Sequence, residues 1–404
     1  MNATKLVVGL MSGTSLDGID AALVKISGAG TETNVEVKHF ISNSFPAEVR
    51  DVLLGVASGQ LVSAGIISQL SVLLGRLYSQ AVFQVCQEVH LPVHQLDLIG
   101  CHGQTIFHQS DPHPLCGHQI TSTLQIGEAA VLAEETGVTT ISDFRPSDMA
   151  VGGSGAPLIP FVDFVLFRDT HLGRVLLNLG GIANITLVPP SCQITEVQAF
   201  DSGPGNMVTD ALIRHFSQGN QQFDAEGYLA RSGNILSTVL DSLLSDPYFH
   251  RHPPKSAGRE QFGDAFVKNL LTLAESDTIE DIVCTATELT ARTVTEAVLQ
   301  SANAHIQLDQ LVVSGGGVHN KHLMQRLKEL LPHLALVPIN KLGVHSDAKE
   351  ALGFAILANE TFELGTSNLP SVTGARHPVI LGKVSYGKNY GKLRRRFQGM
   401  GGKT

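Results

Sequence analysis

Among the residues of this 404-residue chain, Asp201 has the neighbours best suited to acid–base chemistry. It lies in the segment FDSGPGN, residues 200–206, at the predicted end of a strand and just before a helix. Open α/β sheets present reactive groups at the carboxyl ends of their strands. A carboxylate at such a position can deprotonate a hydroxyl group or a water molecule in line with a γ-phosphate. The alternative is that Asp201 only caps the following helix.

A glycine-rich turn near the start of the chain could hold phosphate groups. Apolar residues that favour strands flank the polar segment SGTSLDGID at 12–20. Glycines let the backbone approach a phosphate closely, and hydroxyl groups add hydrogen-bond donors. Asp17 and Asp20 could hold Mg²⁺, directly or through water. The alternative is an ordinary glycine-rich hairpin.

A second segment of the same design, 174–188, places Gly180 and Gly181 between two predicted strands. Two such hairpins in the two halves of one chain suggest a duplicated nucleotide-binding fold. This plan resembles that of the actin-like ATPase superfamily. A third glycine cluster, 315–317, follows a predicted strand where that superfamily places its adenosine-contacting turn. The P-loop pattern and the strand–GxGxxG–helix unit are both absent from the sequence, which argues against those two nucleotide sites.

Other polar segments leave more than one interpretation open. Arg145 lies in SDFRPSDMAVGGSGAPL, residues 142–158, and could bind a substrate carboxylate or form a structural ion pair. Glu350, in the first turn of a predicted helix, could face a cleft or lie on an ordinary amphipathic surface. The cysteines and histidines of 101–118 match no standard metal-binding spacing.

These residues need strands and helices to position them. In the first half we expect strands within 1–45, two helices within 46–90, a strand at 97–101, a helix at 127–136 and a strand at 138–141. In the second half we expect strands at 174–179, 182–188, 196–200 and 310–314, and helices near 206–217, 223–244, 263–276, 280–303, 319–331 and 347–361.

The predicted fold class is therefore α/β, a duplicated actin-like (ribonuclease H-like) ATPase fold of two domains with a nucleotide cleft between them. The length also favours two domains. We expect the first domain to comprise 1–141 and 371–390 and the second to comprise 142–370, with 391–404 as a flexible basic tail.

Composition limits the partners and the compartment. The formal net charge of −9 argues against nucleic acid or an anionic membrane as the main partner. No segment is expected to reach the length of a transmembrane helix. The five cysteines form no CxxC pair, which is typical of a cytoplasmic protein with reduced thiols.

Eight motifs, in this order, resemble those of the anhydro-N-acetylmuramic acid kinases. They are GLMSGTSLDGID at 9–20, GCHGQT at 100–105, SDFRPSDMAVGGSGAPL at 142–158, NLGGIAN at 178–184, FDSGPGN at 200–206, KSAGREQF at 255–262, SGGGVHN at 314–320 and KEALGFA at 349–355. The resemblance runs from about Leu6 to Gly382. It implies an enzyme of peptidoglycan recycling that opens the 1,6-anhydro ring of its sugar with water and phosphorylates O6 with ATP. The implied products are N-acetylmuramic acid 6-phosphate and ADP.

The resemblance also implies roles for individual residues. Asp201 matches the catalytic base, and Thr105, Arg145 and Glu350 match sugar contacts. The residues that would bind ATP are Gly13, Thr14, Ser15, Leu16, Asp17, Gly18, Ile19, Asp20, Gly180, Gly181, Gly315, Gly316 and Gly317. Mg²⁺ would accompany ATP near Asp17 or Asp20, and a homodimer is left open. Ser154 departs from the family, which often has glutamine there, so the sugar contact of that loop is in doubt.

Two other functions stay open on sequence alone. A kinase of the same superfamily could act on another sugar or on a carboxylic acid. A nucleotide-dependent scaffold or chaperone could share the fold, although the sequence has no appended peptide-binding region.

Overall fold

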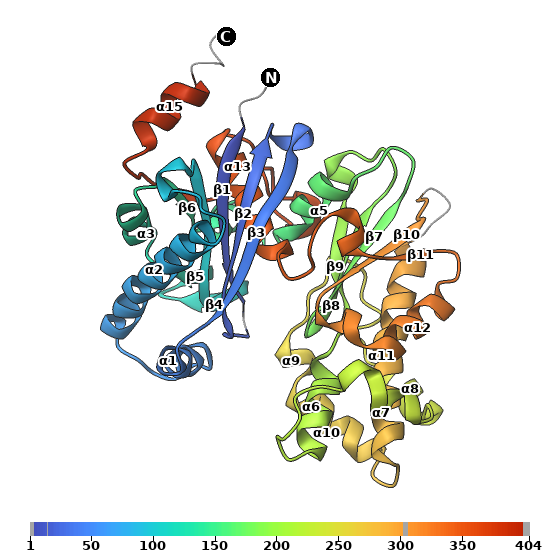
Figure 1. The fold of residues 1–404 in the computed structure, drawn as a ribbon. Helices are drawn as coiled ribbons and strands as arrows, with labels where there is room; N and C mark the ends of the chain where they lie inside the picture. The colour runs from blue at the N-terminus through green and yellow to red at the C-terminus, as the bar shows by residue number, and fades with distance from the viewer. Residues whose placement is uncertain (1–3, 14, 302–305, 399–404) are drawn as a thin grey trace. The chain divides into compact units, whose positions relative to one another are not determined.

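A computed structural model describes residues 4–13, 15–301 and 306–398 (Figure 1). The chain folds into two compact units: unit 1 comprises Met1–Leu166 with Asp347–Thr404, and unit 2 comprises Phe167–Ser346. These boundaries differ from the predicted ones at 142 and 371. The reason is that segments on both sides of unit 2 pack together in unit 1. The Phe144 and Phe354 rings lie 5.4 Å apart, and the buried Lys349 ammonium lies 2.7 Å from Asp163.

Unit 1 is built on a mixed sheet of order β12-β6-β4-β1-β2-β3, with β5 paired to β4. Its strands are β1 (Lys5–Ser12), β2 (Gly18–Ser27), β3 (Asn34–Ser44), β4 (Leu98–Leu115), β5 (His118–Ile126), β6 (Thr140–Ser142) and β12 (Lys383–Ser385). The first three strands form antiparallel pairs, whereas β4 runs parallel to β1 and β6 runs parallel to β4.

Helices cover both faces of this sheet. They are η1 (Gly30–Glu32), α1 (Ala47–Ala57), α2 (Ala64–Gln87), η2 (Val93–Gln95), α3 (Ala129–Thr136), α4 (Phe144–Ala150), α5 (Ile159–Phe167), α13 (Lys349–Phe362), α14 (Pro370–Thr373) and α15 (Tyr390–Gln398). In β1, Val8 and Leu10 share an apolar core with Leu74 and Tyr78 of α2. Because side chains alternate along a strand, Gly9 points to the other face, where α13 lies.

Helix α13 lies directly on the backbone of the sheet (Figure 1, red beside blue β1). Gly9 and Gly100 are paired across β1 and β4. A Cβ atom added at Gly9 would lie 1.8 Å from the Ala351 carbonyl oxygen, and one at Gly100 would lie 2.1 Å from that of Phe354. The two glycines therefore permit a contact that any side chain would prevent.

Helix α2 corrects one expectation. Among the described residues it is the one helix long and apolar enough to cross a membrane, judged by length and composition alone. Its residues Leu70, Leu74, Tyr78 and Val82 are buried in the core of unit 1.

Unit 2 repeats the strand order of unit 1. Its sheet has the order β11-β10-β7-β8-β9 and consists of β7 (Arg174–Leu179), β8 (Ile182–Val188), β9 (Gln198–Pro204), β10 (Gln310–Ser314) and β11 (Ala335–Pro338). Again three antiparallel strands are followed by two parallel ones, because β10 pairs parallel with β7 and with β11. The same arrangement in both units confirms the duplicated actin-like fold.

The helices of unit 2 pack against this sheet and against one another. They are η3 (Ile194–Glu196), α6 (Met207–Phe216), η4 (Ala225–Gly227), α7 (Tyr228–Ser232), α8 (Ser237–Leu244), α9 (Arg259–Phe262), α10 (Asp264–Leu273), α11 (Ile279–Ser301), η5 (Gly316–His319), α12 (Lys321–Leu330) and η6 (Ile339–Leu342). The single helix predicted over 223–244 is wrong. The chain there breaks into η4, α7 and α8, because Glu226 and Gly227 adopt positive φ angles before α7 and Gly233 is extended after it.

The predicted basic tail is described only as far as Gln398. Residues 390–398 form helix α15, in which Leu393 is buried. Residues 399–404 lie outside the described part of the chain.

Candidate functional site

The first glycine-rich turn joins β1 to β2 in unit 1. The Leu16 amide donates to the Gly13 carbonyl at 3.2 Å, and Leu16 adopts a positive φ of 59° with its side chain in the core. Ser15 and Asp17 are exposed. The predicted ligand Thr14 lies outside the described residues. The turn therefore exposes Ser15 and Asp17 to solvent, while the buried Leu16 side chain holds the turn against the core.

Carboxylates gather beside this turn. Burial raises the pKa of the half-buried Asp20 carboxyl; a hydrogen bond from Ser42 opposes this, and the charges of Asp347 and Asp17 raise it further. Asp17 is exposed and lies 3.4 Å from Arg50. A divalent cation would relieve the repulsion between these carboxylates. Within the described residues, however, no group of three or more His, Cys, Asp or Glu side chains is arranged to hold a metal.

Arg145 and Glu350, two of the three predicted sugar contacts, act on each other electrostatically in unit 1. Arg145 is half-buried, and burial lowers its pKa to about 10 against the opposing charge of Glu350. The Glu350 residue is exposed, yet the loss of water around its carboxyl raises the pKa of that group. Lys349 and Arg145 lower that pKa, and Asp20 raises it. Arg145 and Glu350 therefore place a cation and a carboxylate in the same part of unit 1. Among the described residues, the two side chains form no direct ion pair.

Arg145 is held by two neutral acceptors. Its Nε–H donates to His102 Nε2 at 3.0 Å, and its Nη1 donates to the Gly155 carbonyl at 2.8 Å. Thr105, the third predicted contact, is half-buried and accepts a hydrogen bond from Gln125 Nε2 at 3.1 Å. The sequence pattern gave no signal for His102 beyond its place in the GCHGQT segment.

In unit 2, Asp201 lies opposite Asn184 of β8 in the middle of β9, not at the end of a strand as predicted, because the strand continues to Pro204. The Asn184 amide donates to Asp201 Oδ1, and the Ala257 backbone N–H donates to Oδ2 at 2.8 Å. Burial raises the pKa of the Asp201 carboxyl, and these two hydrogen bonds oppose the rise without cancelling it. The side chain makes no cap contact with α6, whose first residue is Met207, so the helix-cap alternative is wrong.

The loop after α8 completes the surroundings of Asp201. The Tyr248 hydroxyl donates to the Asp201 carbonyl at 2.9 Å, and the Asp201 amide donates to the Lys255 carbonyl at 3.1 Å. Sequence reasoning noted KSAGREQF only as a shared motif and assigned it no role. In the structure, Lys255 and Ala257 of this segment contact Asp201 through their backbone groups. No local sequence pattern could indicate these contacts.

Polar side chains form a row across the sheet of unit 2. Ser314, Asn178, Asn184 and Asp201 are paired in register across β10, β7, β8 and β9. Hydrogen bonds at 3.4 and 3.5 Å continue the row from Ser314 through Asn178 to Asn184. The row runs from the third glycine cluster to the candidate base.

The remaining predicted nucleotide residues meet around Asn206. Its backbone N–H donates to Gly180 and its side-chain amide to Leu179. A Cβ atom added at Gly317 would lie 2.9 Å from Asn206 Oδ1, and Gly315, with φ of 83°, donates to the Ser346 hydroxyl. The structure thus brings Gly180, Gly181 and 315–317 together.

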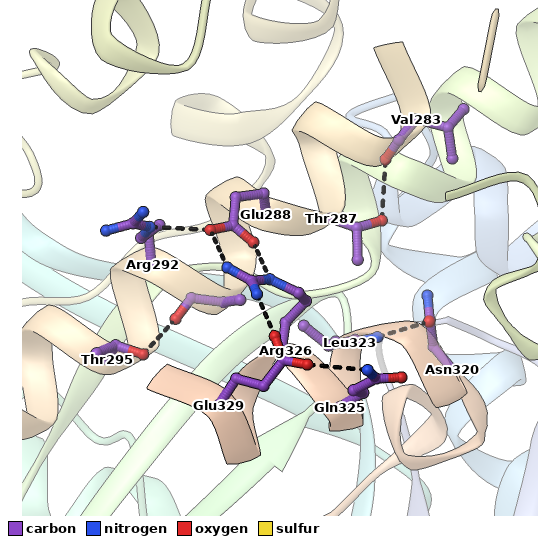
Figure 2. A network of polar contacts seen from close by, with 11 residues as sticks. Val283, Thr287, Glu288, Arg292, Thr295, Asn320, Leu323, Gln325, Arg326 and Glu329 are labelled. Atoms are coloured by element: carbon purple, nitrogen blue, oxygen red, sulfur yellow. Dashed lines mark hydrogen bonds and ion pairs between the residues drawn. The ribbon is translucent and has the colours of Figure 1, made fainter. Parts of the chain in front are cut away.

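An ionic network anchors α12, the helix that follows this turn (Figure 2). Glu288, fully buried on α11, accepts hydrogen bonds from Arg326 of α12 at 2.7 and 3.0 Å and from Arg292 at 2.9 Å. Asn320 caps α12 by accepting from the Leu323 amide. The network fixes the helix whose start adjoins the predicted adenosine turn.

A duplicated actin-like fold, glycine-rich turns at the strand ends and a half-buried carboxylate in the sheet of unit 2 are the features of a phosphotransferase of the sugar kinase class. Comparisons then identify the family. The family model described as anhydro-N-acetylmuramic acid kinase matches residues 5–387. The chain belongs to the anhydro-N-acetylmuramic acid kinase family.

Relatives and solved structures are similar to the chain to very different degrees. An anhydro-N-acetylmuramic acid kinase of Caldanaerobacter subterraneus subsp. tengcongensis is 43% identical over 94% of this chain and 97% of its own length. One of Bacillus thuringiensis subsp. konkukian is 42% identical over 94% and 99%.

The solved structures are more distant. A Clostridium difficile activator of 2-hydroxyisocaproyl-CoA dehydratase with bound ADPNP has a TM-score of 0.42 at 12% identity, covering 90% of this chain and 96% of its own. A ROK family glucokinase of Streptomyces griseus has a TM-score of 0.38 at 11% identity, covering 88% and 99%. Likeness at these values adds nothing to the assignment.

Proposed function

We propose that this enzyme hydrolytically opens the 1,6-anhydro ring of anhydro-N-acetylmuramic acid and phosphorylates O6 with ATP. The products are N-acetylmuramic acid 6-phosphate and ADP, and the reaction serves peptidoglycan recycling and amino-sugar catabolism. Family membership names the substrate. The observation that carries the chemistry is the half-buried Asp201 carboxylate, which Asn184 and Ala257 hold in the middle of β9.

In this proposal Asp201 acts as the general base. It takes a proton from a water molecule, whose oxygen forms a bond to C1 of the sugar. The C1–O6 bond breaks, and O6 attacks the γ-phosphorus of ATP while ADP leaves. The raised pKa of Asp201 suits this role, because a stronger base accepts the water proton more readily.

ATP would be bound by the three glycine clusters. The turn 13–20 of unit 1 supplies backbone N–H groups for the phosphates, and Gly180, Gly181 and 315–317 of unit 2 supply the rest. Mg²⁺ would accompany ATP near Asp17 or Asp20, whose carboxylates alone form no metal site among the described residues. When bound, it offsets charge on the phosphoryl oxygens.

The sugar would be bound by Thr105, Arg145 and Glu350. N-acetylmuramic acid carries a carboxylate on its lactyl group, and a guanidinium can bind a carboxylate through two parallel hydrogen bonds. Ser154 instead uses its hydroxyl within its own loop, where it donates to the Ala156 carbonyl at 2.5 Å. We therefore assign Ser154 no contact with the sugar.

We also propose a cytoplasmic location, and we leave open a homodimer. The five cysteines are free, and four of them are at least partly buried, which supports a reducing compartment. Size-exclusion chromatography with light scattering measures the number of subunits directly.

Mass spectrometry of the product tests the reaction. Purified protein, Mg-ATP and the 1,6-anhydro sugar are incubated in ¹⁸O-labelled water. We expect a 6-phosphosugar with the label at C1, because the water oxygen is added there. A 6-phosphosugar without label would refute the coupled hydrolysis. Persistence of ATP and no phosphosugar would refute the substrate, and a panel of other sugars and carboxylic acids would then identify the acceptor.

A further inference from the structure

We propose that His102 is a positioning residue, which fixes the orientation of the Arg145 guanidinium for binding the sugar carboxylate. This inference rests on the proposed function, since it takes Arg145 to be a sugar contact. It adds a residue to which neither the motifs nor the comparisons assign a role.

The hydrogen bonds of His102 determine its tautomer. The ring is 3% exposed, and its Nδ1 lies 2.8 Å from the Gly103 carbonyl oxygen. Because a carbonyl oxygen only accepts, Nδ1 carries the proton. At the other side, Nε2 lies 3.0 Å from Arg145 Nε, and because that N–H only donates, Nε2 is the acceptor. Both ring nitrogens are thus used by a neutral imidazole.

The ring cannot easily leave this position. The His102 and Phe354 ring centroids lie 4.6 Å apart, so α13 packs against one side of the imidazole. Burial and the neighbouring Arg145 charge hold the pKa of His102 well below its ordinary value, which keeps Nε2 available as an acceptor. The imidazole is therefore a fixed and neutral support.

A neutral support suits a cation that must bind an anion. The second acceptor of Arg145, the Gly155 carbonyl, is also neutral. An aspartate in place of His102 would hold the guanidinium equally well but would compete with a substrate carboxylate for its charge. With Nε and one Nη1 hydrogen used, the Nη2 group makes no hydrogen bond to any residue in the described part of the chain and stays available for a ligand.

Two substitutions of the same residue separate positioning from packing. The glutamine side chain can place its oxygen near the Nε2 position, whereas the shorter asparagine reaches only the Nδ1 position. We expect His102→Asn to raise the KM for the anhydro sugar about tenfold, the effect of losing one hydrogen bond to a charged group. The KM for ATP should change little, and His102→Gln should restore most of the sugar affinity.

Matched controls show whether the effect passes through Arg145. His113 lies on the same strand and is exposed, so His113→Asn should leave the sugar KM unchanged. Arg145→Lys keeps the charge but removes the Nε–H donor. If His102 acts through Arg145, the double variant His102→Asn/Arg145→Lys binds sugar no more weakly than Arg145→Lys alone.

Each result has one interpretation. If Arg145→Lys leaves the sugar KM unchanged, the assigned role of Arg145 fails and with it that part of the proposed function. If Arg145→Lys raises the KM but His102→Asn does not, the positioning role is overturned. Equal losses for asparagine and glutamine, or additive effects in the double variant, also overturn it. Nitrogen NMR of the labelled ring gives an independent readout, in which a protonated Nε2 would contradict the tautomer.

Discussion

At Asp201, burial and hydrogen bonding act in opposite directions on one carboxylate. If it is the base, Asp201→Asn should lower kcat by about 10³-fold, because an amide cannot accept the water proton. Nucleotide binding should persist, and an ATP analogue should shift the thermal midpoint as in the wild type. Asp210→Asn on α6 is the control, since burial also raises the pKa of that carboxyl, to about 6, but no role in the reaction is assigned to it. A variant with near-normal turnover would remove Asp201 from the mechanism.

Asn184 sets how strongly Asp201 holds its proton. Its hydrogen bond lowers the pKa of Asp201, so Asn184→Ala should let that pKa rise further. The base must be deprotonated to act, and the acid limb of the pH profile of kcat/KM should therefore move to higher pH. Rates measured between about pH 4 and 8 test this. An acid limb that stays in place, or moves to lower pH, contradicts the role of Asn184.

At the scale of elements, the Glu288 network joins α11 to α12 (Figure 2). Burial alone would raise the pKa of Glu288, but the hydrogen bonds and charges of Arg326 and Arg292 outweigh it and the pKa is lowered. We expect Glu288→Gln to lower the free energy of unfolding by about 2 kcal/mol at pH 7, because Arg326 loses its buried anion. Glu329→Gln, at the exposed end of the network, should have no measurable effect.

The sign of the pH dependence follows from the lowered pKa. Glu288 stabilises the fold above its unfolded pKa of about 4.3, and this contribution is lost as the pH falls through the folded value. The difference between wild type and Glu288→Gln in urea unfolding should therefore shrink below about pH 4. A constant difference down to pH 3 would assign the effect to packing instead.

The contact of α13 with the sheet depends on two glycines. Gly9→Ala should lower the free energy of unfolding by about 3 kcal/mol, because the new methyl group meets the Ala351 carbonyl and moves the helix. Since α13 carries Glu350, the sugar KM should rise as well. Gly65→Ala in the first turn of α2 meets only ordinary contacts and should be neutral or slightly stabilising. A stable Gly9→Ala protein would contradict the close approach.

At the scale of the whole molecule, repeated patterns could be predicted and long-range contacts could not. The strand–glycine–strand segments at 7–26 and 174–188 and the later strand at 310–314 were sufficient to predict a duplicated fold, because local propensity and tertiary structure agree there. The breaks at Glu226 and Gly227 and the extent of α2 were missed. Apolar periodicity alone does not show where a helix stops.

The residues of the candidate site fall into the same two groups, those that a local sequence pattern indicates and those that only the fold brings into place. Residue type and spacing were sufficient to single out Asp201, Arg145 and the glycine clusters as candidates. They gave no signal for the residues that hold these side chains in place. The Ala257 backbone N–H reaches Asp201 from a distant loop, and His102 contacts Arg145 only because β4 and α4 are adjacent in unit 1. Such contacts depend on the fold rather than on a local pattern.

The position of α13 along the chain affects the order in which the two units can finish folding during synthesis. Val7 and Val24 are fully buried on the two neighbouring strands β1 and β2, but α13 follows the whole of unit 2 in the sequence. On the ribosome the first sheet emerges long before the helix that covers one of its faces. Unit 2 is one uninterrupted segment and can fold as soon as it has emerged. The half of the protein that is translated first is thus the half that finishes folding last, with an apolar face uncovered in the meantime.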